Sequence, residues 1–506
     1  MSAAIIALDA GGTAVKATVF DKYGHELSSA HEVMQPLRPQ AGHNERDPDQ
    51  MWDIACSVIR QALSRGGIDP KNVAAIGLTG YGNGLVLVDA EGVPVRNAIL
   101  SSDQRAAGIV ADWRAMGLEA SHIALTFQKL WAGKPLPLLA WLDRHEPKTM
   151  ARARHLLMCK DFLRMKLTGR FALEVGDASS GSLLDQSGRD RQWTPAVLDL
   201  LGLTRYAHLF NEVIEPLSIA GLVTPQAAAA TGLSVGTPVA AGYADGPGVL
   251  IASGVIDDSY LNVIAGTWGL NQLLTTSPVT DGSILASMLG PRPGDYVLVE
   301  GGATSASTFE WFVNTIIAGA SAANQEHYEW CNHSLERIGK NDPPVYFLPW
   351  LDGTPEDAKM RGSFIGLSSF HRLPHLVEAV FEGVAVEHRH HIHRLLANQT
   401  SRPKAVRFAG GAARSQAWLD IFAATLNLPI EIGEAKELGT LSAAILAAVA
   451  VGLYPSLTSA VAAMTRVSQV ITPSAHRVEA MTRRIQGYQT LRDALAETWT
   501  TLDGMK

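Results

Sequence analysis

The amino-terminal part of the chain alternates between apolar runs and short turns. An apolar run over residues 3–8 ends in Asp9, the turn Gly11-Gly12-Thr13 follows, and strand-forming residues alternate over 15–20. This spacing predicts a β-hairpin, with a third strand over residues 25–34. A glycine pair after a strand lets backbone N–H groups approach a phosphate, and the acid before it suits a metal ion. An ordinary glycine-containing hairpin would show the same local pattern.

The pattern then changes to helical spacing. From Pro48 to Leu63, apolar residues recur three and four positions apart, which predicts a helix. A strand predicted over residues 73–78 leads into a glycine-rich polar turn over 79–84, and another strand follows over 85–88. In dinucleotide-binding and P-loop proteins a helix comes directly after the first glycines, but here a returning strand does. The order of these elements therefore favours the plan of the actin-like ATPases.

The second half of the chain repeats the opening pattern. A strand predicted over residues 260–264 is followed by a turn that contains Gly266 and Thr267, and by a returning strand over 268–275. This echo of the first hairpin is typical of a two-lobed ATPase with duplicated halves. We therefore expect an α/β fold of the actin-like, ribonuclease H-like kind, with duplicated domains around a central cleft.

A third glycine turn follows a strand predicted over residues 405–408. Gly410 and Gly411 come directly after that strand, and Ser415 opens a helix. Because glycine backbone can lie close to a ligand, these glycines suit the adenosine part of a nucleotide. The amides of the two hairpin turns would then hold the phosphates from opposite lobes. Lys16 could also reach a phosphate, although a lysine in a strand usually points to solvent.

An apolar strand predicted over residues 237–244 ends at Asp245. The Gly-Pro pair after this acid predicts the start of a helix. A carboxylate there suits the base that accepts the proton of an attacking hydroxyl, because phosphoryl transfer depends on positioning more than on a strong base. The local pattern fits a helix N-cap equally well. No Ser- or Pro-rich linker marks a boundary, and we place it near this segment, with lobes over 1–246 and 247–506.

Composition adds limits to this picture. With 506 residues the chain is too long for one typical core, and its net charge of −7 carries no electrostatic signature of nucleic-acid binding. No secretion signal opens the chain, and the most apolar predicted helix, over 441–453, is too short to span a bilayer. The cysteines are too widely separated for a disulfide framework or a metal-binding pair, which fits a reducing cytosol: Cys56, Cys159 and Cys331. These features predict a cytoplasmic enzyme without nucleic-acid or membrane partners.

Four histidines lie close together in a predicted helix. His388 and His391 could share one face of that helix, and so could His390 and His393. No acidic or thiol ligand pattern accompanies them, and arginines are interleaved. A solvated or inter-lobe helix face is therefore favoured over a metal site. The sequence assigns the cluster no role.

These motifs resemble the FGGY carbohydrate kinases over nearly the whole chain. The most specific match is Gly362–Leu367, followed by His375-Leu376 and Ala379–Glu382, which resembles the second signature of the family. Asp9–Lys16 resembles the phosphate hairpin of the family, Gly242–Gly246 its catalytic-Asp segment and Gly266–Thr267 its second phosphate turn. Further along, Phe347–Leu351 resembles its lower-lobe strand, Phe408–Trp418 its adenosine-binding turn and Glu437–Gly439 the helix start that follows. These segments come in the order that the family has.

The resemblance implies an ATP-dependent sugar kinase that also uses Mg²⁺, with a deep sugar site and ATP above it. It implies that Asp245 is the catalytic base rather than a helix cap, and that Asp9 anchors the metal. The residues expected to hold the nucleotide are Gly11, Gly12, Thr13, Lys16, Gly266, Thr267, Gly410, Gly411 and Ser415. The residues expected to contact the sugar are Asn83, Gly84, Asp103 and Asp245.

Within the family the chain is most similar to the ketopentose kinases, in particular those for L-xylulose. Glu45–Asp47 and Ile99–Arg105 are similar to that branch, and Tyr81–Gly84 stands where D-xylulose kinases commonly have Gln-Met-His-Gly. The expected reaction is phosphorylation of a terminal hydroxyl of L-xylulose or a related pentulose. D-xylulose, erythritol and glycerol are alternative substrates; an actin- or chaperone-like ATPase and a sugar sensor without turnover are alternative functions. The sequence leaves a homodimer open.

Overall fold

Residues from distant parts of the chain make up each of two α/β units. The computed structural model describes residues 4–505 with the exception of 189–190, 320–322, 340, 352, 355–356 and 358. The first unit holds the chain as far as Ile256, and the segments Leu274–Leu298 and Ala435–Arg466 return to it. The second unit holds Asp257–Leu273, Val299–Glu434 and the chain from Val467 onward. Packing thus divides the chain at several points, whereas the sequence motifs suggested one boundary.

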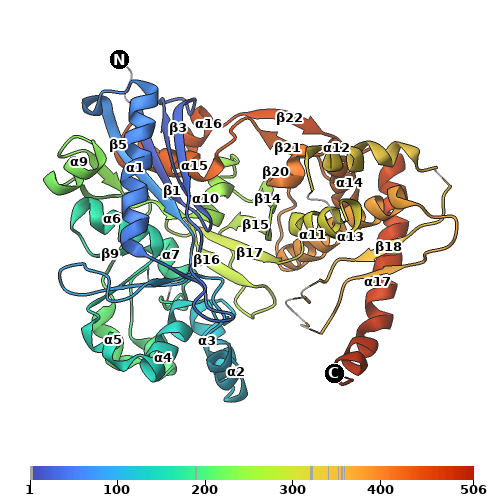
Figure 1. Ribbon diagram of the computed structural model, residues 1–506, viewed down its shortest axis with the longest axis horizontal. Helices are drawn as coiled ribbons and strands as arrows, with labels where there is room; N and C mark the ends of the chain where they lie inside the picture. Colours follow the sequence, from blue (N-terminus) through green and yellow to red (C-terminus); the bar gives the residue numbers. More distant parts are fainter. Residues whose placement is uncertain are drawn as a thin grey trace. The chain divides into compact units, whose positions relative to one another are not determined.

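The first unit is built on a seven-stranded sheet with the order β11-β12-β5-β1-β2-β3, in which β13 also pairs with β5 (Figure 1). Neighbours are antiparallel in β1–β2, β2–β3 and β11–β12, and parallel in β1–β5 and β12–β5. The predicted hairpin and third strand are therefore confirmed. The strands span Ala4–Ala10 (β1), Ala14–Phe20 (β2), Glu26–Val33 (β3), Val73–Gly80 (β5), Ile219–Leu222 (β11), Pro238–Ala240 (β12) and Tyr243–Ala244 (β13).

Helices cover both faces of this sheet. Helix α1 (Pro48–Gly66) packs on β2 and β3, and its buried residues share one apolar cluster with Ile6 and Leu8 of β1. Because side chains alternate along a strand, Asp9 lies on the opposite face of β1. On that face α15 (Leu438–Ala450) packs against β1 and β5.

Helix α15 approaches the sheet closely because small residues meet at the contact. A Cβ atom at Gly77 of β5 would lie 2.1 Å from the carbonyl oxygen of Ala443 in α15, so only glycine fits there. Helix α10 (Asp245–Ala252) packs against the same helix. The ends of β1 and β5 and the start of α10 are therefore positioned along α15.

A second apolar cluster of the first unit includes Trp113, Leu139 and Leu173. Among the remaining elements of this unit, α6 and α7 contribute to the site described below. The helices span Ala107–Ala115 (α2), Leu118–Thr126 (α3), Pro135–His145 (α4), Pro147–Arg152 (α5), Cys159–Thr168 (α6), Val175–Ser180 (α7), Ala196–Leu200 (α8), Pro225–Thr231 (α9) and Leu457–Met464 (α16). The short strands span Glu45–Arg46 (β4), Val86–Val88 (β6), Ala98–Ile99 (β7), His155–Leu157 (β8), Ala172–Glu174 (β9) and Glu212–Ile214 (β10).

The second sheet repeats the strand plan of the first. Its order is β16-β17-β15-β14-β20-β21-β22. The pairs β14–β15 and β21–β22 are antiparallel, and β14–β20 and β20–β21 are parallel, as are their counterparts around β1 and β5. The predicted duplication is thus confirmed by topology. The strands span Tyr260–Ala265 (β14), Gly269–Thr275 (β15), Ala286–Leu289 (β16), Tyr296–Gly302 (β17), Ala405–Ala409 (β20), Ile430–Gly433 (β21) and Val467–Ile471 (β22).

Helices pack in layers in the second unit. Helix α13 packs on α14, and α14 packs on the long carboxy-terminal helix α17. Aromatic rings of Phe309, Phe381 and Trp418 contact one another between α11, α13 and α14. Within the described residues, no helix is long and apolar enough to cross a membrane. The other elements span Ala306–Phe312 (α11), Gln325–Ser334 (α12), Leu373–Leu396 (α13), Gln416–Leu426 (α14), Ala475–Asp503 (α17), Tyr346–Leu348 (β18) and Ser363–Ile365 (β19).

Candidate active site

Asp245 lies at the junction between strand β13 and helix α10. Ala244 is the N-cap of that helix, so Asp245 is its first helical residue, and its Oδ1 accepts a hydrogen bond from the N–H of Gly246 at 2.6 Å. Burial raises the pKa of Asp245 to about 6, against the lowering effect of hydrogen bonds from the N–H groups of Gly246 and Gly82. A carboxylate with this pKa is ionised at neutral pH and can accept a proton. The N-cap role that the sequence left open belongs to Ala244.

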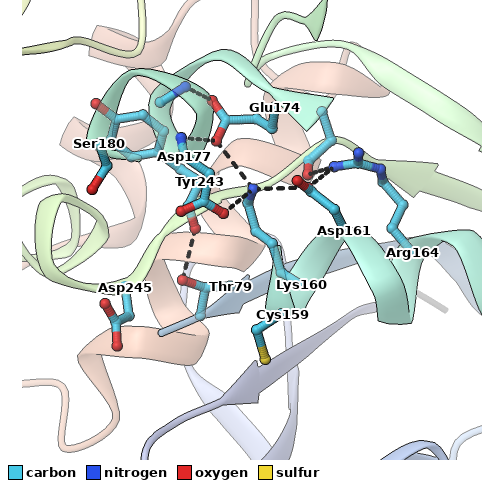
Figure 2. Close-up of polar contacts among 12 residues, drawn as sticks. Thr79, Cys159, Lys160, Asp161, Arg164, Glu174, Asp177, Ser180, Tyr243 and Asp245 are labelled. Carbon is cyan, nitrogen blue, oxygen red and sulfur yellow. Dashed lines mark hydrogen bonds and ion pairs between the residues drawn. The ribbon is translucent and has the colours of Figure 1, made fainter. Parts of the chain in front are cut away.

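Buried side chains fix the strand that precedes Asp245 (Figure 2). The hydroxyl of Thr79, in β5, donates a hydrogen bond to the carbonyl oxygen of Tyr243 at 2.8 Å. The phenol of Tyr243 donates to the carbonyl oxygen of Leu289 at 2.7 Å. A Cβ atom at Gly176 of α7 would lie 2.0 Å from the Tyr243 ring, so glycine makes room for it. The position of Asp245 is therefore set by three neighbouring elements rather than by its own loop.

Asp9 lies near the carboxyl end of β1, where the first hairpin turns. Its Oδ1 is buried and has no hydrogen-bond partner among the described residues. Burial, with the charge of Asp245 as the next cause, raises the pKa of Asp9 to about 7. Gly439 in the first turn of α15 leaves room for the carboxylate, since a Cβ atom there would lie 2.2 Å from Asp9 Oδ2. A free carboxylate oxygen of this kind fits a cation ligand.

Protein ligands alone do not make a metal site in the part of the chain that the structure describes. No group of three or more His, Cys, Asp or Glu side chains there is arranged to hold an ion. Mg²⁺ usually keeps several waters and takes one or two carboxylates together with phosphate oxygens. The single unpartnered carboxylate of Asp9 fits that kind of ion better than one that needs a cage of side chains.

Arg46 fixes the turn of the first hairpin. It is fully buried, and its guanidinium donates to the carbonyl oxygen of Gly11 at 2.9 Å and to that of Gly12. Because a trans peptide directs its N–H away from its C=O, the N–H groups of Gly12 and Thr13 point away from Arg46. Both residues are exposed, and a Cβ atom at Gly12 would meet nothing within 4 Å. The turn thus presents two N–H groups to open space, and Arg46 is a residue that sequence reasoning missed.

Lys16 lies beside Asp9 in the first hairpin. The two residues are cross-strand partners, and Lys16 Nζ is 2.7 Å from Glu437 Oε2 at the start of α15. Both side chains of this ion pair are about one-third exposed, at 36% and 35%. The ammonium of Lys16 lowers the pKa of Asp9. A phosphate near this lysine would compete with Glu437.

Asn83 and Gly84 form a tight turn that follows β5. Their φ angles are 63° and 69°, and a Cβ atom at Gly84 would lie 2.3 Å from the carbonyl oxygen of Ile99, so only glycine fits. The amide nitrogen of Asn83 donates to Ser180 Oγ at 3.2 Å. Asn83 Oδ1 is buried without a partner among the described residues. This oxygen can therefore accept a hydrogen bond from a ligand hydroxyl.

Asp103 holds an arginine in place. Its fully buried carboxylate accepts a hydrogen bond from the N–H of Asn44 at 2.7 Å, and from Arg105 through the backbone N–H at 2.8 Å and the guanidinium at 2.9 Å. Arg105 also lies 2.7 Å from Glu45 and over the ring of Trp141. Both oxygens of Asp103 are thus engaged by the chain. Its predicted contact with the sugar would require one of these bonds to break.

The glycine turns of the second unit lie next to each other. Strands β14 and β20 are parallel neighbours with Ile264 opposite Ala409, which brings the turn at Gly266 and Thr267 beside Gly410 and Gly411. Gly410 has φ 96°, and a Cβ atom there would lie 2.4 Å from the carbonyl oxygen of Ala265, so glycine is required. A Cβ atom at Gly266 would have ordinary contacts, at 3.7 Å or more. The two turns therefore offer exposed backbone within one unit.

Ser415 caps helix α14. Its Oγ accepts a hydrogen bond from the N–H of Trp418 at 3.1 Å and donates to Asn332 Oδ1 at 2.5 Å. A 3₁₀ turn over Gly411–Arg414 lies between Gly410 and this helix. The Ser415 hydroxyl, which the sequence suggested for the nucleotide, is thus already engaged by the chain. A serine directly before a helix commonly acts as its N-cap, so this role could have been predicted from the sequence.

The histidine cluster is a solvated helix face only in part: His393 is exposed and His390 is half-buried, whereas the other two histidines face the interior. His388 and His391 are buried, with exposed fractions of 1% and 2%. His388 lies 3.0 Å from Ser305 Oγ and 2.9 Å from Asn271 Oδ1. Burial lowers the pKa of His388 to about 3 and that of His391 to about 4, so both are neutral at physiological pH. These rings form part of the core of the second unit.

Family models match both halves of the chain. The model of the N-terminal domain of the FGGY family of carbohydrate kinases matches residues 4–251. The model of the C-terminal domain of the same family matches residues 261–451. Together the two matches span most of the sequence in the order that the family has.

Individual proteins show the same likeness. The chain is 32% identical over 492 residues to the L-xylulose/3-keto-L-gulonate kinase of Escherichia coli (strain K12), with 97% of each chain covered. It is 34% identical over 448 residues to a probable L-xylulose kinase of Pasteurella multocida (strain Pm70), covering 87% of this chain and 89% of that protein. The crystal structure of a ligand-bound xylulose kinase from Lactobacillus acidophilus matches with a TM-score of 0.90 over 99% of both chains, at 23% identity. That last match concerns the fold alone.

Proposed function

The chain belongs to the FGGY family of carbohydrate kinases, and we propose that it phosphorylates a terminal hydroxyl of L-xylulose or a related pentulose. The activity class, transfer of a phosphoryl group from ATP to a carbohydrate, follows from the family. The choice of acceptor is supported by two relatives above 30% identity over most of their length, both named for L-xylulose. The turn Tyr81–Gly84 contains no histidine, which is in keeping with an acceptor other than D-xylulose.

The position of Asp245 carries the proposed mechanism. Its ionised carboxylate accepts the proton of the sugar hydroxyl while that oxygen attacks the γ-phosphorus of ATP. The bond between the γ-phosphorus and its bridging oxygen breaks, and ADP leaves. The raised pKa of about 6 brings the carboxylate closer to the operating pH than an ordinary aspartate. Because the transition state is loose, correct placement of the two substrates supplies much of the rate.

Backbone groups hold the nucleotide in this proposal. The N–H groups of Gly12 and Thr13, directed outward by Arg46, suit the phosphates, and those near Gly266 and Thr267 suit the same role from the second unit. Gly11 and Lys16 flank the first of these turns. The exposed backbone at Gly410 and Gly411 suits the adenosine, with Ser415 supporting it through the cap of α14.

Mg²⁺ is part of the same proposal. Asp9 is the ligand that the chain would offer, largely through water, as its unpartnered Oδ1 suggests. Bound with ATP, the ion would neutralise charge on the phosphate oxygens. On the sugar side, Asn83 and Gly84 would line the site with Asp245, and Asp103 would act through Arg105.

Two functions of other classes make different predictions. An actin- or chaperone-like ATPase would hydrolyse ATP slowly, without any effect of a sugar. A sugar sensor would bind the sugar and leave ATP intact. The raised pKa values of Asp9 and Asp245 and the room that Gly439 leaves for the Asp9 carboxylate favour turnover. A cytoplasmic enzyme is proposed on the free and buried state of Cys56, Cys159 and Cys331.

The test is ADP formation over a panel of L-xylulose, D-xylulose, erythritol, glycerol and other pentuloses and pentitols. We expect the highest kcat/KM with L-xylulose or a related pentulose, and sugar-dependent ADP formation well above the rate without sugar. A higher kcat/KM for erythritol or glycerol would reject the pentulose. Sugar-independent hydrolysis would support the ATPase, and sugar binding without ADP formation would support the sensor.

A further inference from the structure

A buried ion cluster lies directly behind the segment that carries Asp245 (Figure 2). Lys160 Nζ lies 2.6 Å from Asp177 Oδ2 and 3.1 Å from carboxylate oxygens of both Glu174 and Asp161. Arg164 lies 2.7 Å from Asp161. The exposed fractions of all five side chains are 0–1%. Buried ions persist only where partners compensate for the lost water, so each oxygen in the cluster should be accounted for.

One oxygen that faces the segment of Asp245 is not accounted for. Glu174 accepts hydrogen bonds from the N–H groups of Gly176 and Asp177 in addition to its contact with Lys160. Asp177 is bound to Lys160 through Oδ2, but its Oδ1 is buried and has no partner among the described residues. Asp161 also has one such oxygen, but it lies on the side of Lys160 that faces Arg164. A buried carboxylate oxygen left unpaired is unfavourable unless a ligand group completes it.

The free oxygen of Asp177 lies close to Gly82, where the absence of a side chain leaves room. A Cβ atom built at Gly82 would lie 3.4 Å from Asp177 Oδ1, 3.6 Å from Ser180 Oγ and 3.8 Å from the Cβ of Ala244, which are ordinary contacts. Gly82 has no left-handed φ and is only partly buried. The space therefore has room for a methyl group beside the free oxygen of Asp177.

The same glycine connects this space with the reacting centre. The N–H of Gly82 donates to the carboxylate of Asp245. On its other side Gly82 faces Asp177 and Ser180. The next residue, Asn83, adds a second unpartnered oxygen, and its amide nitrogen donates to Ser180 Oγ. Two free acceptor oxygens and one hydroxyl thus lie near Gly82, which itself contacts the proposed base.

We propose that Asp177, Ser180 and Asn83 form a subsite that binds the hydroxyl groups of the acceptor that are not phosphorylated. Asp177 Oδ1 and Asn83 Oδ1 each accept a hydrogen bond from a sugar O–H, and Lys160 holds Asp177 in place from behind. The ligand class is a polyhydroxylated carbon chain, because a donor is needed at each free oxygen. The inference rests on the proposed function and extends it to residues that determine specificity.

Three variants test the subsite without changing Asp245. Asp177→Asn places an amide where an acceptor is needed, and we expect the KM for the sugar to rise about 10–100-fold. Ser180→Ala should raise it about three- to tenfold. Gly82→Ala fills the space with the methyl group that it can hold, so the protein should fold normally and lose sugar affinity. The KM for ATP should stay within twofold of the unsubstituted protein in all three variants.

Ser179→Ala is the matched control for Ser180→Ala. The Ser179 hydroxyl donates to the carbonyl oxygen of Gly176 at 3.0 Å and accepts from the N–H of Leu289 at 3.0 Å, so it is engaged by the chain. Its loss should lower the melting temperature and leave the KM for the sugar unchanged. Sugar affinity measured by calorimetry without nucleotide should follow the same order as the KM values.

Monodeoxy analogues of the sugar give a second readout. In the unsubstituted protein, the analogue that lacks the hydroxyl bound by Asp177 should bind more weakly than the sugar, and in Asp177→Asn that difference should disappear. If Ser180→Ala and Gly82→Ala both bind the sugar within twofold of the unsubstituted protein, the subsite is rejected, whether or not Asp177→Asn folds. If the unsubstituted protein uses another polyol of the panel, the pentulose proposal fails, and the same comparison with that polyol decides the subsite.

Discussion

The two hairpins of the molecule share a backbone plan and differ in the chemistry that they carry. Each lies beside a parallel strand that runs into a glycine turn, with Asp9 opposite Thr79 in the first and Ile264 opposite Ala409 in the second. Asp9 and Ile264 are therefore equivalent positions, one residue before the end of the first strand of each hairpin. The first hairpin combines amide groups with a carboxylate. The second offers amide groups and an apolar side chain.

This difference separates two tasks within a duplicated fold. Backbone N–H groups can bind phosphate wherever the turn geometry is kept, so both copies are suited to the nucleotide. Proton transfer and cation binding need carboxylates, and the two that we propose for these tasks, Asp245 and Asp9, both lie in the first unit. Burial raises the pKa of both, to about 7 for Asp9 and to about 6 for Asp245. We infer that both hairpins hold the nucleotide and that the first unit alone performs the chemistry.

The largest effect is expected for Asp245→Asn. Loss of the base should lower kcat by about two to four decades, while ATP affinity stays close to normal. The control is Asp53→Asn, which removes an exposed acid of α1 and should leave kcat unchanged. Steady-state kinetics and calorimetry with ATP provide the two measurements. Near-normal turnover of Asp245→Asn would show that Asp245 is not the base, and would contradict the assignment of the chemistry to the first unit.

Asp9→Asn should lower the catalytic efficiency with ATP and stabilise the fold. We expect kcat/KM for ATP to fall about 10–100-fold because a charge-assisted contact is lost. The pKa of Asp9 is about 7 in the folded chain, above its ordinary value of 3.8, so folding disfavours its ionised form. This penalty develops as the pH rises from about 4 to about 7 and is constant above that.

The stability change is therefore expected to depend on pH. Asp9→Asn should raise the free energy of unfolding by about 1–3 kcal/mol at pH 8 and by little at pH 4, after allowance for solvent screening. Denaturant unfolding at both pH values provides the measurement. An equal change at both values would show that the effect does not arise from the charge of Asp9.

Gly12→Val and Gly266→Val test the shared task of the two hairpins. A Cβ atom at Gly12 meets nothing within 4 Å, and one at Gly266 meets nothing closer than 3.7 Å, so both variants should fold. Each should raise the KM for ATP about tenfold, the equivalent of about one hydrogen bond, and leave the KM for the sugar unchanged. Gly108→Val, at another open glycine, is the control. An effect in only one hairpin would show that the copies do not share the nucleotide.

The smallest effect is expected in the pH dependence of the unsubstituted enzyme. The base must be ionised, so kcat/KM for the sugar should fall as the pH drops through about 6, the pKa of Asp245. The loss should approach about tenfold per pH unit below that value. Gly266→Val should keep the same profile, because the second hairpin carries no acid at the equivalent position. A shifted pH profile in that variant would show that the second hairpin affects the ionisation of Asp245, contrary to our inference.

Local patterns in the sequence predicted the fold well. The hairpin, the third strand and helix α1 each follow from residues close together in the chain, and the repeat at residues 260–275 was visible as a strand-turn-strand echo. Gly84 and Gly410 were found for the same reason, because positive φ and close backbone approach select glycine at both positions. Asp245 at the end of a strand was likewise readable from its neighbours.

Contacts between distant segments could not be predicted in this way. Arg46 binds carbonyl groups of a turn that lies far from it along the chain. In the sequence it stands out only as part of Glu45–Asp47, a segment similar to the ketopentose kinases. Lys160 and Arg164 stand in a helix where charged residues normally face solvent, yet both are buried against carboxylates. The ion pair between Asp103 and Arg105, by contrast, joins residues only two positions apart, so it could have been predicted from the sequence.

The metal dependence of turnover tests the contrast between the two hairpins most directly. The activation constant for Mg²⁺ is to be measured at fixed ATP and saturating sugar for the unsubstituted enzyme, Asp9→Asn and Gly266→Val. We predict that Asp9→Asn raises this constant about tenfold or more, while Gly266→Val leaves it unchanged and raises only the KM for ATP. Equal shifts of the Mg²⁺ constant in both variants would contradict the assignment of cation binding to the first hairpin alone.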